Sequence, residues 1–131
     1  MKLHWSPRSP YVRFAMATAH EKGLVEQLEI VRTIVGPFHV TPGIYPDNPA
    51  GKIPTLVLDD GTELFDSRVI AAYFDWISDS GPNLYPAEEL PRFDTLRREA
   101  LGINLIDHFV TLLIERWKPE GGPLAALVDA E

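Results

Sequence analysis

The alternation of apolar and polar positions predicts a strand, a helix and a second strand in the first part of the chain. Residues 2–5 form a short apolar run, and apolar residues then recur at the spacing of one helix face: Val12, Ala15, Met16 and Ala19. Gly23, preceded by a lysine, marks the end of this helix. Residues 28–35 alternate polar and β-branched side chains, which favours a half-buried strand. A right-handed crossover would make this strand parallel to the first.

Turn-forming residues and a second periodic stretch predict the elements that follow. Residues 36–54 are rich in proline and glycine, which favours an ordered loop with one short helical turn. Residues 54–65 predict two strands joined at Asp60–Gly61, because glycine accepts the positive φ of a tight turn. An Asp-Ser pair at 66–67 then precedes a helix. The apolar face of that helix is predicted to consist of Val69, Ile70, Tyr73, Phe74 and Ile77.

The last third of the chain predicts a linker and one long helix, from Leu90 to Trp117. Half of the residues of this helix are apolar, and they spread more widely than one contact stripe needs. The helix must therefore be covered on more than one side, and the chain looks cut short. We expect an α/β domain over residues 1–78, a linker over 79–89 and part of an all-helical domain over 90–131.

Composition and charge narrow the classes of partner. The 131-residue chain has a formal net charge of −7 and a pI near 5.0, which argues against nucleic acid or an anionic membrane as a partner. It has no uncharged run long enough to span a bilayer. Charged residues and prolines interrupt any signal-like apolar core near the amino terminus, so we expect a cytoplasmic protein.

The cysteine and histidine content narrows the chemistry. The chain has no cysteine, which excludes disulfides, thiolate metal sites and any reaction through a thiolate of the protein. Its four histidines lack the spacing of a metal site, and we expect no bound metal.

Three segments together resemble the glutathione S-transferase family: a Ser-Pro-Tyr at the first helix, GKIPTL before the strand pair, and DS at the next helix. Residues 48–74, NPAGKIPTLVLDDGTELFDSRVIAAYF, match the family's order of Asn-Pro, Gly-Lys, Ile-Pro, strand pair, acid-Ser and helix. Residues 96–120 look like the first helix of the second domain in bacterial members. The resemblance implies a thioredoxin-like first domain of the form βαβ-ββα with a mixed four-stranded sheet, followed by the first long helix of an all-α domain.

The resemblance also implies glutathione as co-substrate, and it assigns the contacts. Ile53 and Pro54 match the family's cis-proline turn, where the backbone N–H and C=O of Ile53 would pair with the cysteinyl backbone. Ser67 would bind the γ-glutamyl carboxylate at a helix amino terminus, and Asp66 would face the ammonium group. Lys52 corresponds to the lysine that meets the glycine carboxylate. A strand-opening proline, ordinary helix capping and a solvated lysine are the structural alternatives.

Two further residues of the proline-rich loop are candidates with different roles. His39 stands at a separation from the lysine similar to that of a glycine-end histidine in theta-type members. The surrounding loop differs from the family's, which makes this the weakest of the assigned contacts. Asn48 is predicted to organise the turn through an Asx-type bond rather than to touch the ligand.

Two serines compete for the thiol-activating role. Ser9 falls where the catalytic serine of theta- and zeta-like members stands when residues are counted back from Gly23, whereas Ser6 aligns only with a shifted loop. Serine followed by proline is also a common helix start, so capping alone would explain Ser9. The same position would let its hydroxyl donate a hydrogen bond to the sulfur of glutathione and favour the thiolate. Ser9 is the favoured residue and Ser6 the alternative.

The resemblance therefore implies a cytoplasmic detoxification enzyme of the glutathione S-transferase type, which conjugates glutathione to small hydrophobic electrophiles. It also implies a homodimer. A non-catalytic module that binds glutathione or dimerises is the alternative function.

Overall fold

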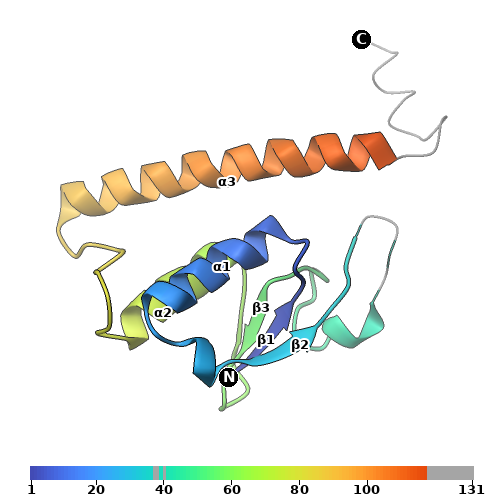
Figure 1. Cartoon of the computed structure of the whole chain (residues 1–131), viewed down its shortest axis with the longest axis horizontal. Helices are drawn as coiled ribbons and strands as arrows, with labels where there is room; N and C mark the ends of the chain where they lie inside the picture. The colour runs from blue at the N-terminus through green and yellow to red at the C-terminus, as the bar shows by residue number, and fades with distance from the viewer. Residues whose placement is uncertain (37–38, 40, 118–131) are drawn as a thin grey trace, which may run out of the picture.

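A mixed four-stranded sheet forms the centre of the protein in the computed structural model, which describes residues 1–36, 39 and 41–117 (Figure 1). The strands are β1 (Lys2–Trp5), β2 (Glu29–Arg32), β3 (Thr55–Val57) and β4 (Glu63–Leu64), arranged in the order β2-β1-β3-β4. β1 pairs in parallel with β2 and antiparallel with β3, and β3 pairs antiparallel with β4. The predicted α/β fold with a mixed sheet is confirmed.

The helices of this region are α1 (Pro10–Glu21) and α2 (Ser67–Ile77), which pack against each other on one face of the sheet (Figure 1). Short 3-10 turns, η1 (Val25–Gln27) and η2 (Pro42–Ile44), lie in the connections. The second of these is the helical turn that the sequence predicts within the proline-rich loop. The hairpin turn is also as predicted, with Gly61 at φ 87°.

The core lies between the sheet and the two helices. Its central members are Leu3 and Leu56 of the sheet, Ala15 and Ala19 of α1, and Ile70 and Phe74 of α2, which are all fully buried. Burying one large apolar side chain contributes about 1.5–3 kcal/mol. This cluster is therefore what holds the two helices on the sheet.

Two sequence expectations about burial are wrong in detail. The strand predicted at 28–35 is half that length, and as an edge strand it leaves Ile30 exposed while Leu28 and Thr33 at its ends are buried. Val69, which the helical spacing predicts on the buried face of α2, is 46% exposed. The buried face of α2 instead consists of Ser67, Ile70, Ala71 and Phe74.

The segment between α2 and the last helix is hydrogen-bonded to a buried ion pair, and Lys22 Nζ donates to the backbone oxygen of Pro82 at 3.1 Å. Lys22 Nζ lies 3.0 Å from Asp75 Oδ1, with the two side chains 3% and 6% exposed. Asp75 also accepts hydrogen bonds from the backbone N–H groups of Leu84 and Tyr85. Gly81 passes so close to the end of α1 that a Cβ there would lie 2.1 Å from a backbone oxygen. The predicted linker therefore has a fixed path along the domain.

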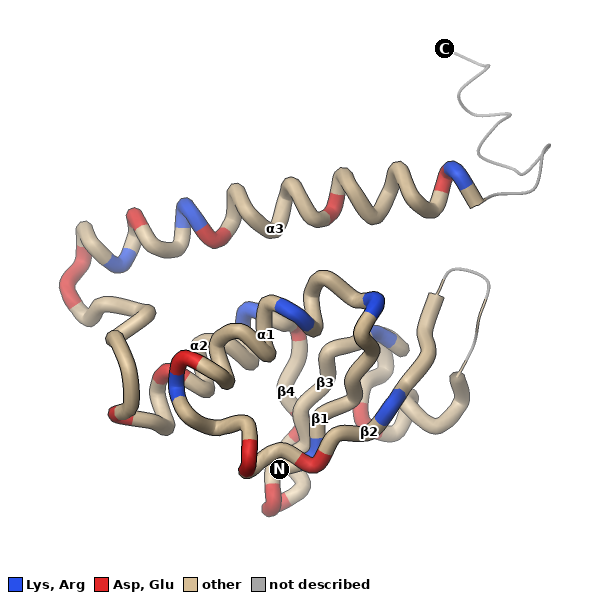
Figure 2. The backbone as a smooth tube through the Cα atoms, in the orientation of Figure 1, with Lys and Arg blue, Asp and Glu red and all other residues tan. Residues whose placement is uncertain are grey.

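Helix α3 (Glu89–Trp117) runs alongside the first domain and leaves most of its surface open (Figure 1). Its charges gather in its first half, and between Glu99 and Glu115 the only Asp, Glu, Lys or Arg is Asp107 (Figure 2). No α3 residue is buried, and its exposed large apolar side chains are Leu90, Phe93, Leu101, Leu105, Phe109, Leu112 and Trp117. Across the described helices, none combines the length and hydropathy needed to cross a bilayer.

Candidate functional site

The strand register brings three of the predicted site segments to one end of the sheet. His4 pairs with Thr55 near the end of β1, and Leu64 at the end of β4 pairs with Leu56. Because both pairings are antiparallel, the chain leaving β1, the chain entering β3 and the chain leaving β4 lie at the same end of the sheet. These are the segments that carry the two serines, the Ile-Pro turn and the Asp-Ser pair.

Ser9 caps α1, and its hydroxyl hydrogen is still available to donate a hydrogen bond. Its Oγ accepts a hydrogen bond from the backbone N–H of Val12 at 3.2 Å, and Pro10 follows at the first helical position. The side chain is half-buried. Within the described part of the chain its hydroxyl donates to no acceptor, so it can donate to a ligand at the amino terminus of the helix.

Ser6 lies at the start of the turn that ends at Ser9 and has a different local role. Its backbone oxygen accepts from the N–H of Ser9 at 3.2 Å, and its Oγ accepts a long hydrogen bond of 3.4 Å from the N–H of Arg8. Both contacts stabilise the turn that leads into the helix. The two serines therefore lie in one turn, and only Ser9 is the helix cap.

Ile53 presents a free backbone beside this turn. The Ile53–Pro54 peptide bond is cis, as the resemblance implies. The Ile53 side chain is buried in a cluster with Val12 and Ile44, which joins the Ile-Pro turn to the first turn of α1. Neither the N–H nor the C=O of Ile53 bonds to any described residue. An extended peptide could pair with both groups, as an added strand does.

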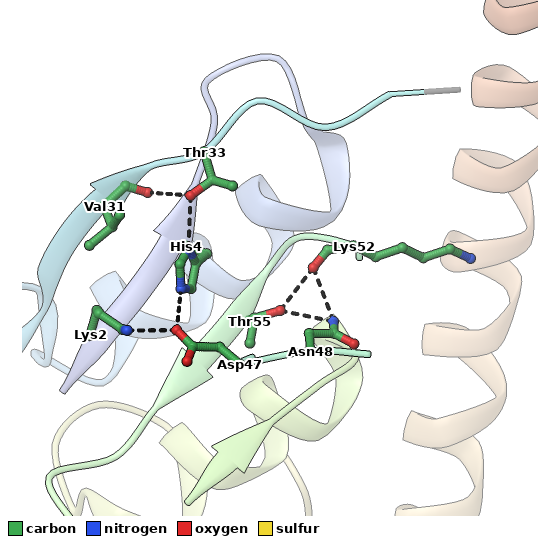
Figure 3. Close-up of polar contacts among 8 residues, drawn as sticks. All are labelled: Lys2, His4, Val31, Thr33, Asp47, Asn48, Lys52 and Thr55. Atoms are coloured by element: carbon green, nitrogen blue, oxygen red, sulfur yellow. Dashed lines mark hydrogen bonds and ion pairs between the residues drawn. The ribbon is translucent and has the colours of Figure 1, made fainter. Parts of the chain in front are cut away.

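The turn before Ile53 is held by Asn48 (Figure 3). Its Oδ1 accepts from the N–H of Ala50 at 2.9 Å, which confirms the predicted Asx-type bond. Its Nδ2 donates to the backbone oxygen of Lys52 at 3.0 Å and to Thr55 Oγ1 at 2.9 Å. The Lys52 side chain extends away from this network, and its ammonium group has no ion-pair partner among the residues described (Figure 3).

Asp66 and Ser67 open α2 in the same manner as Ser9 opens α1. Asp66 Oδ1 accepts from the N–H of Arg68 at 2.9 Å, and Oδ2 pairs with the Arg68 guanidinium at 3.0 Å. Burial acts to raise the pKa of Asp66, but the hydrogen bonds from Arg68 outweigh it and hold the pKa below its ordinary value. An ammonium group at Asp66 would have to share this carboxylate with Arg68.

Ser67 is 2% exposed, and its hydroxyl has no hydrogen-bond partner among the described residues. No fully buried side-chain polar atom in the same part of the chain lacks a partner, so this hydroxyl keeps a small opening to the solvent. The backbone N–H of Ser67 opens the first turn of α2 beside the hydroxyl, whereas the N–H of Arg68 is already bonded to Asp66.

His39 stands apart from this group in what the structure shows. It forms an isolated bridge with Gly36, its backbone N–H donates to Gly36 oxygen at 3.1 Å, and it is exposed. No contact between its side chain and the other predicted site residues is present in the described ranges. Its assigned role stays a prediction.

One polar contact across the site was not predicted from the sequence. Tyr11 of α1 donates a hydrogen bond to Asp107 of α3, and burial together with this bond raises the pKa of Tyr11 to about 12. The pKa of Arg68 is raised first by its hydrogen bond to Asp66, and the charges of Glu99 and Asp107 on α3 act in the same direction. An isolated acid in the apolar half of α3 was the only signal of this contact, and it does not reveal a partner.

A groove of about 430 Å³ lies between α1 and α3, but none of the predicted site residues lines it. It belongs to the other end of the α1 surface, near Thr18, Glu21 and Tyr85. In the described ranges, no three His, Asp or Glu side chains gather as a metal site would require.

Comparison with known proteins gives one consistent family. Residues 8–76 match the family model described as the N-terminal domain of glutathione S-transferase. The uncharacterised GST-like protein YibF of Escherichia coli K12 is 31% identical over 119 residues, which cover 91% of this chain and 56% of that protein.

Solved structures agree with the family match. A glutathione transferase family member from Pseudomonas fluorescens Pf-5, crystallised with bound glutathione, has a TM-score of 0.86 and 35% identity, covering 92% of this chain and 59% of that one. A glutathione S-transferase from Methylobacillus flagellatus KT with glutathione bound has a TM-score of 0.81 and 34% identity, covering 92% and 57%. The chain thus spans less than three fifths of the length of these relatives.

Proposed function

Because the chain belongs to the glutathione S-transferase family, we propose that it binds glutathione at the end of the sheet described above and transfers it to small hydrophobic electrophiles. The observation that carries the proposal is that Ser9 caps the helix whose first turn packs through Val12 on Ile53, a residue with an unbonded backbone. The glutathione bound in the Pseudomonas and Methylobacillus structures supports the choice of ligand.

In this proposal the sulfur of glutathione lies at the amino terminus of α1 and accepts a hydrogen bond from the Ser9 hydroxyl. The positive end of the helix dipole and this hydrogen bond both favour the thiolate over the thiol. A thiol of pKa about 8.5 that is lowered by roughly two units would be mostly ionised at neutral pH. The serine assignment, as in theta- and zeta-like members, rests on the sequence count and on this cap, with Ser6 as the alternative.

The rest of the peptide is held by groups that have no partner among the described residues, together with Asp66, which is paired with Arg68. The N–H and C=O of Ile53 pair with the cysteinyl backbone, and the amino terminus of α2 with Ser67 binds the γ-glutamyl carboxylate. Lys52 binds the glycine carboxylate. Asp66 accepts the ammonium group in competition with Arg68.

The chemical step is a substitution at carbon. The thiolate forms a C–S bond with the electrophile, and the leaving group departs with its electron pair. The protein contributes the position and the ionisation of the sulfur. Because these 131 residues contain no cysteine, the proposal includes no mixed disulfide between glutathione and this chain.

The test is to measure glutathione binding by calorimetry and conjugation of a chlorinated dinitrobenzene by the 131-residue chain. We expect both binding and turnover. Binding without turnover that Ser9→Ala leaves unchanged would favour the alternative, a non-catalytic binding module. An absence of binding would reject the proposal.

We also propose that the protein is a homodimer that uses α2 and α3. Trp76 on α2 is 80% exposed, and the apolar half of α3 has no cover in the described chain. A contiguous apolar surface of this kind is a common mark of an interface.

A further inference from the structure

Two side chains of β1 hold a carboxylate of the proline-rich loop. Lys2 Nζ and His4 Nε2 lie 2.6 and 2.7 Å from the same oxygen, Asp47 Oδ2 (Figure 3). Residues two apart on a strand point to the same face, so Lys2 and His4 lie opposite the core residue Leu3. The loop is therefore fastened to the face of the sheet that α1 and α2 do not cover.

His4 is fixed on its other side as well. Its Nδ1 lies 2.8 Å from Thr33 Oγ1, and that hydroxyl also donates to the backbone oxygen of Val31 at 3.1 Å. His4 and Thr33 are only 5% and 4% exposed. A ring with both nitrogens bonded in a buried setting has one orientation, so the point at which it holds Asp47 is fixed.

Asp47 directly precedes the turn that carries the proposed glutathione contacts, so its fixed position also fixes the start of that turn. It is followed by Asn48, which is 1% exposed and bonds to the Lys52 oxygen and to Thr55 (Figure 3). The next residue after Lys52 is Ile53, whose backbone is free. The segment from Asp47 to Thr55 is thus held at both ends, by the sheet at Asp47 and by β3 at Thr55.

The charges agree with a tight attachment. Asp47 has the Lys2 ammonium group and a ring nitrogen of His4 on one oxygen, and the hydrogen bonds with Lys2 and then His4 hold the pKa of Asp47 below its ordinary value. Removing the carboxylate would leave the buried Nε2 of His4 without its partner, and a buried polar group without a partner is costly.

We propose that Lys2, His4 and Asp47, here called the loop anchor, are positioning residues that hold residues 47–53 in the shape that binds glutathione. The inference rests on the proposed function. The anchor touches neither the sulfur nor the electrophile, so it acts on glutathione affinity and not on the chemical step. If the loop is in the binding shape for only a fraction of the time, the apparent affinity falls by that fraction.

The test compares Asp47→Ala with Asp59→Ala in the full chain. Asp59 is a matched control because it also pairs with a cation of the chain's start, the Met1 amino group at 2.9 Å, but lies in the β3–β4 hairpin and is 90% exposed. We expect Asp47→Ala to raise the Kd and the KM for glutathione about tenfold while kcat at saturating glutathione stays within twofold. Asp47→Asn, which keeps an acceptor for His4, should recover most of the affinity.

Hydrogen exchange of the ligand-free protein gives a readout that does not depend on catalysis. The N–H groups of Asn48 and Gly51 bond to loop oxygens at 2.8 and 2.9 Å, and they should exchange faster in Asp47→Ala than in Asp59→Ala. Should Asp47→Ala not fold, Thr33→Val removes only the oxygen that holds Nδ1 and is expected to raise the Kd about threefold.

An unchanged Kd in Asp47→Ala, an equal change in Asp59→Ala, or a fall in kcat at constant KM would overturn the inference. If the unsubstituted protein binds no glutathione, the proposed function fails instead. The exchange experiment then decides on the anchor, and equal exchange in the two variants would reject it.

Discussion

A hydroxyl group can accept and donate at the same time, and Ser9 uses one half of this capacity to start α1. Its Oγ accepts a hydrogen bond from the N–H of Val12, as the side chain of a helix cap ordinarily does. Its hydroxyl hydrogen bonds to none of the described residues, so it is available to a ligand. The structural alternative for Ser9 is thus compatible with the functional one.

Replacing Ser9 separates these two roles. Ser9→Ala should lower kcat/KM for conjugation about 10- to 100-fold and raise the pKa of the bound glutathione thiol, measured by the ultraviolet absorbance of the thiolate. It should also cost about 1 kcal/mol of stability through the lost cap. Ser9→Asp keeps a capping oxygen without a proton to donate, so it should restore stability but not activity. A larger loss of activity in Ser6→Ala would assign the role to Ser6.

Lys52 gives a second test at this scale, because its ammonium group is solvent-exposed and unpaired within the described ranges. Lys52→Ala should raise the Kd for glutathione about three- to tenfold, and the effect should shrink at high salt because an exposed charge is screened. γ-Glutamylcysteine lacks the glycine carboxylate and serves as the control ligand. An equal loss of affinity for both ligands would contradict the assigned contact.

At the scale of elements, what the sequence predicted well was local. The Asp60–Gly61 turn and the caps at Ser9 and Asp66 depend on residues within three positions of one another. Contacts between segments far apart in the sequence were not predicted, since Tyr11 and Asp107 are 96 residues apart and His4 and Asp47 are 43 apart. The three segments that carry the predicted site residues were assigned by resemblance, and the strand register explains why they lie at one end of the sheet.

The buried ion pair between Lys22 and Asp75 predicts a response to acid. Burial acts to raise the pKa of Asp75, but the N–H groups of Leu84 and Tyr85 and then Lys22 outweigh it and hold the pKa below the ordinary value. A depressed folded-state pKa adds stability that is present above the unfolded pKa of about 3.9 and is lost as pH falls through the folded value.

Denaturant unfolding between neutral and acidic pH measures this contribution. Asp75→Ala should lower the unfolding free energy at neutral pH by about 3 kcal/mol, because it leaves Lys22 buried without its partner. Its stability should then fall less steeply below about pH 4 than that of the unsubstituted protein. The control is Asp94→Ala, which breaks exposed pairs with Arg97 and Arg98 and should leave the stability unchanged. Parallel acid curves for the unsubstituted protein and Asp75→Ala would contradict this role of the ion pair.

At the scale of the whole molecule, the second half of α3 presents exposed apolar side chains, among them Leu105, Phe109 and Leu112. If it is part of a homodimer interface, light scattering should give twice the chain mass of 14.7 kDa. Phe109→Glu, at a residue 57% exposed in the apolar half, should shift the mass to 14.7 kDa. Leu90→Glu, at 82% exposure in the charged half, is the matched control and should not. A mass of 14.7 kDa for the unsubstituted protein would refute the dimer.

The position of β2 at the edge of the sheet has a consequence for solubility. An edge strand offers a row of free backbone groups to another chain, and the exposed Ile30 beside them would favour such pairing. Glu29 and Arg32 stand at the two ends of this strand and are both exposed. A neighbouring copy docking there would have to strip water from these charges. Glu29 and Arg32 thus oppose the pairing of β2 with another copy and the growth of a continuous intermolecular sheet.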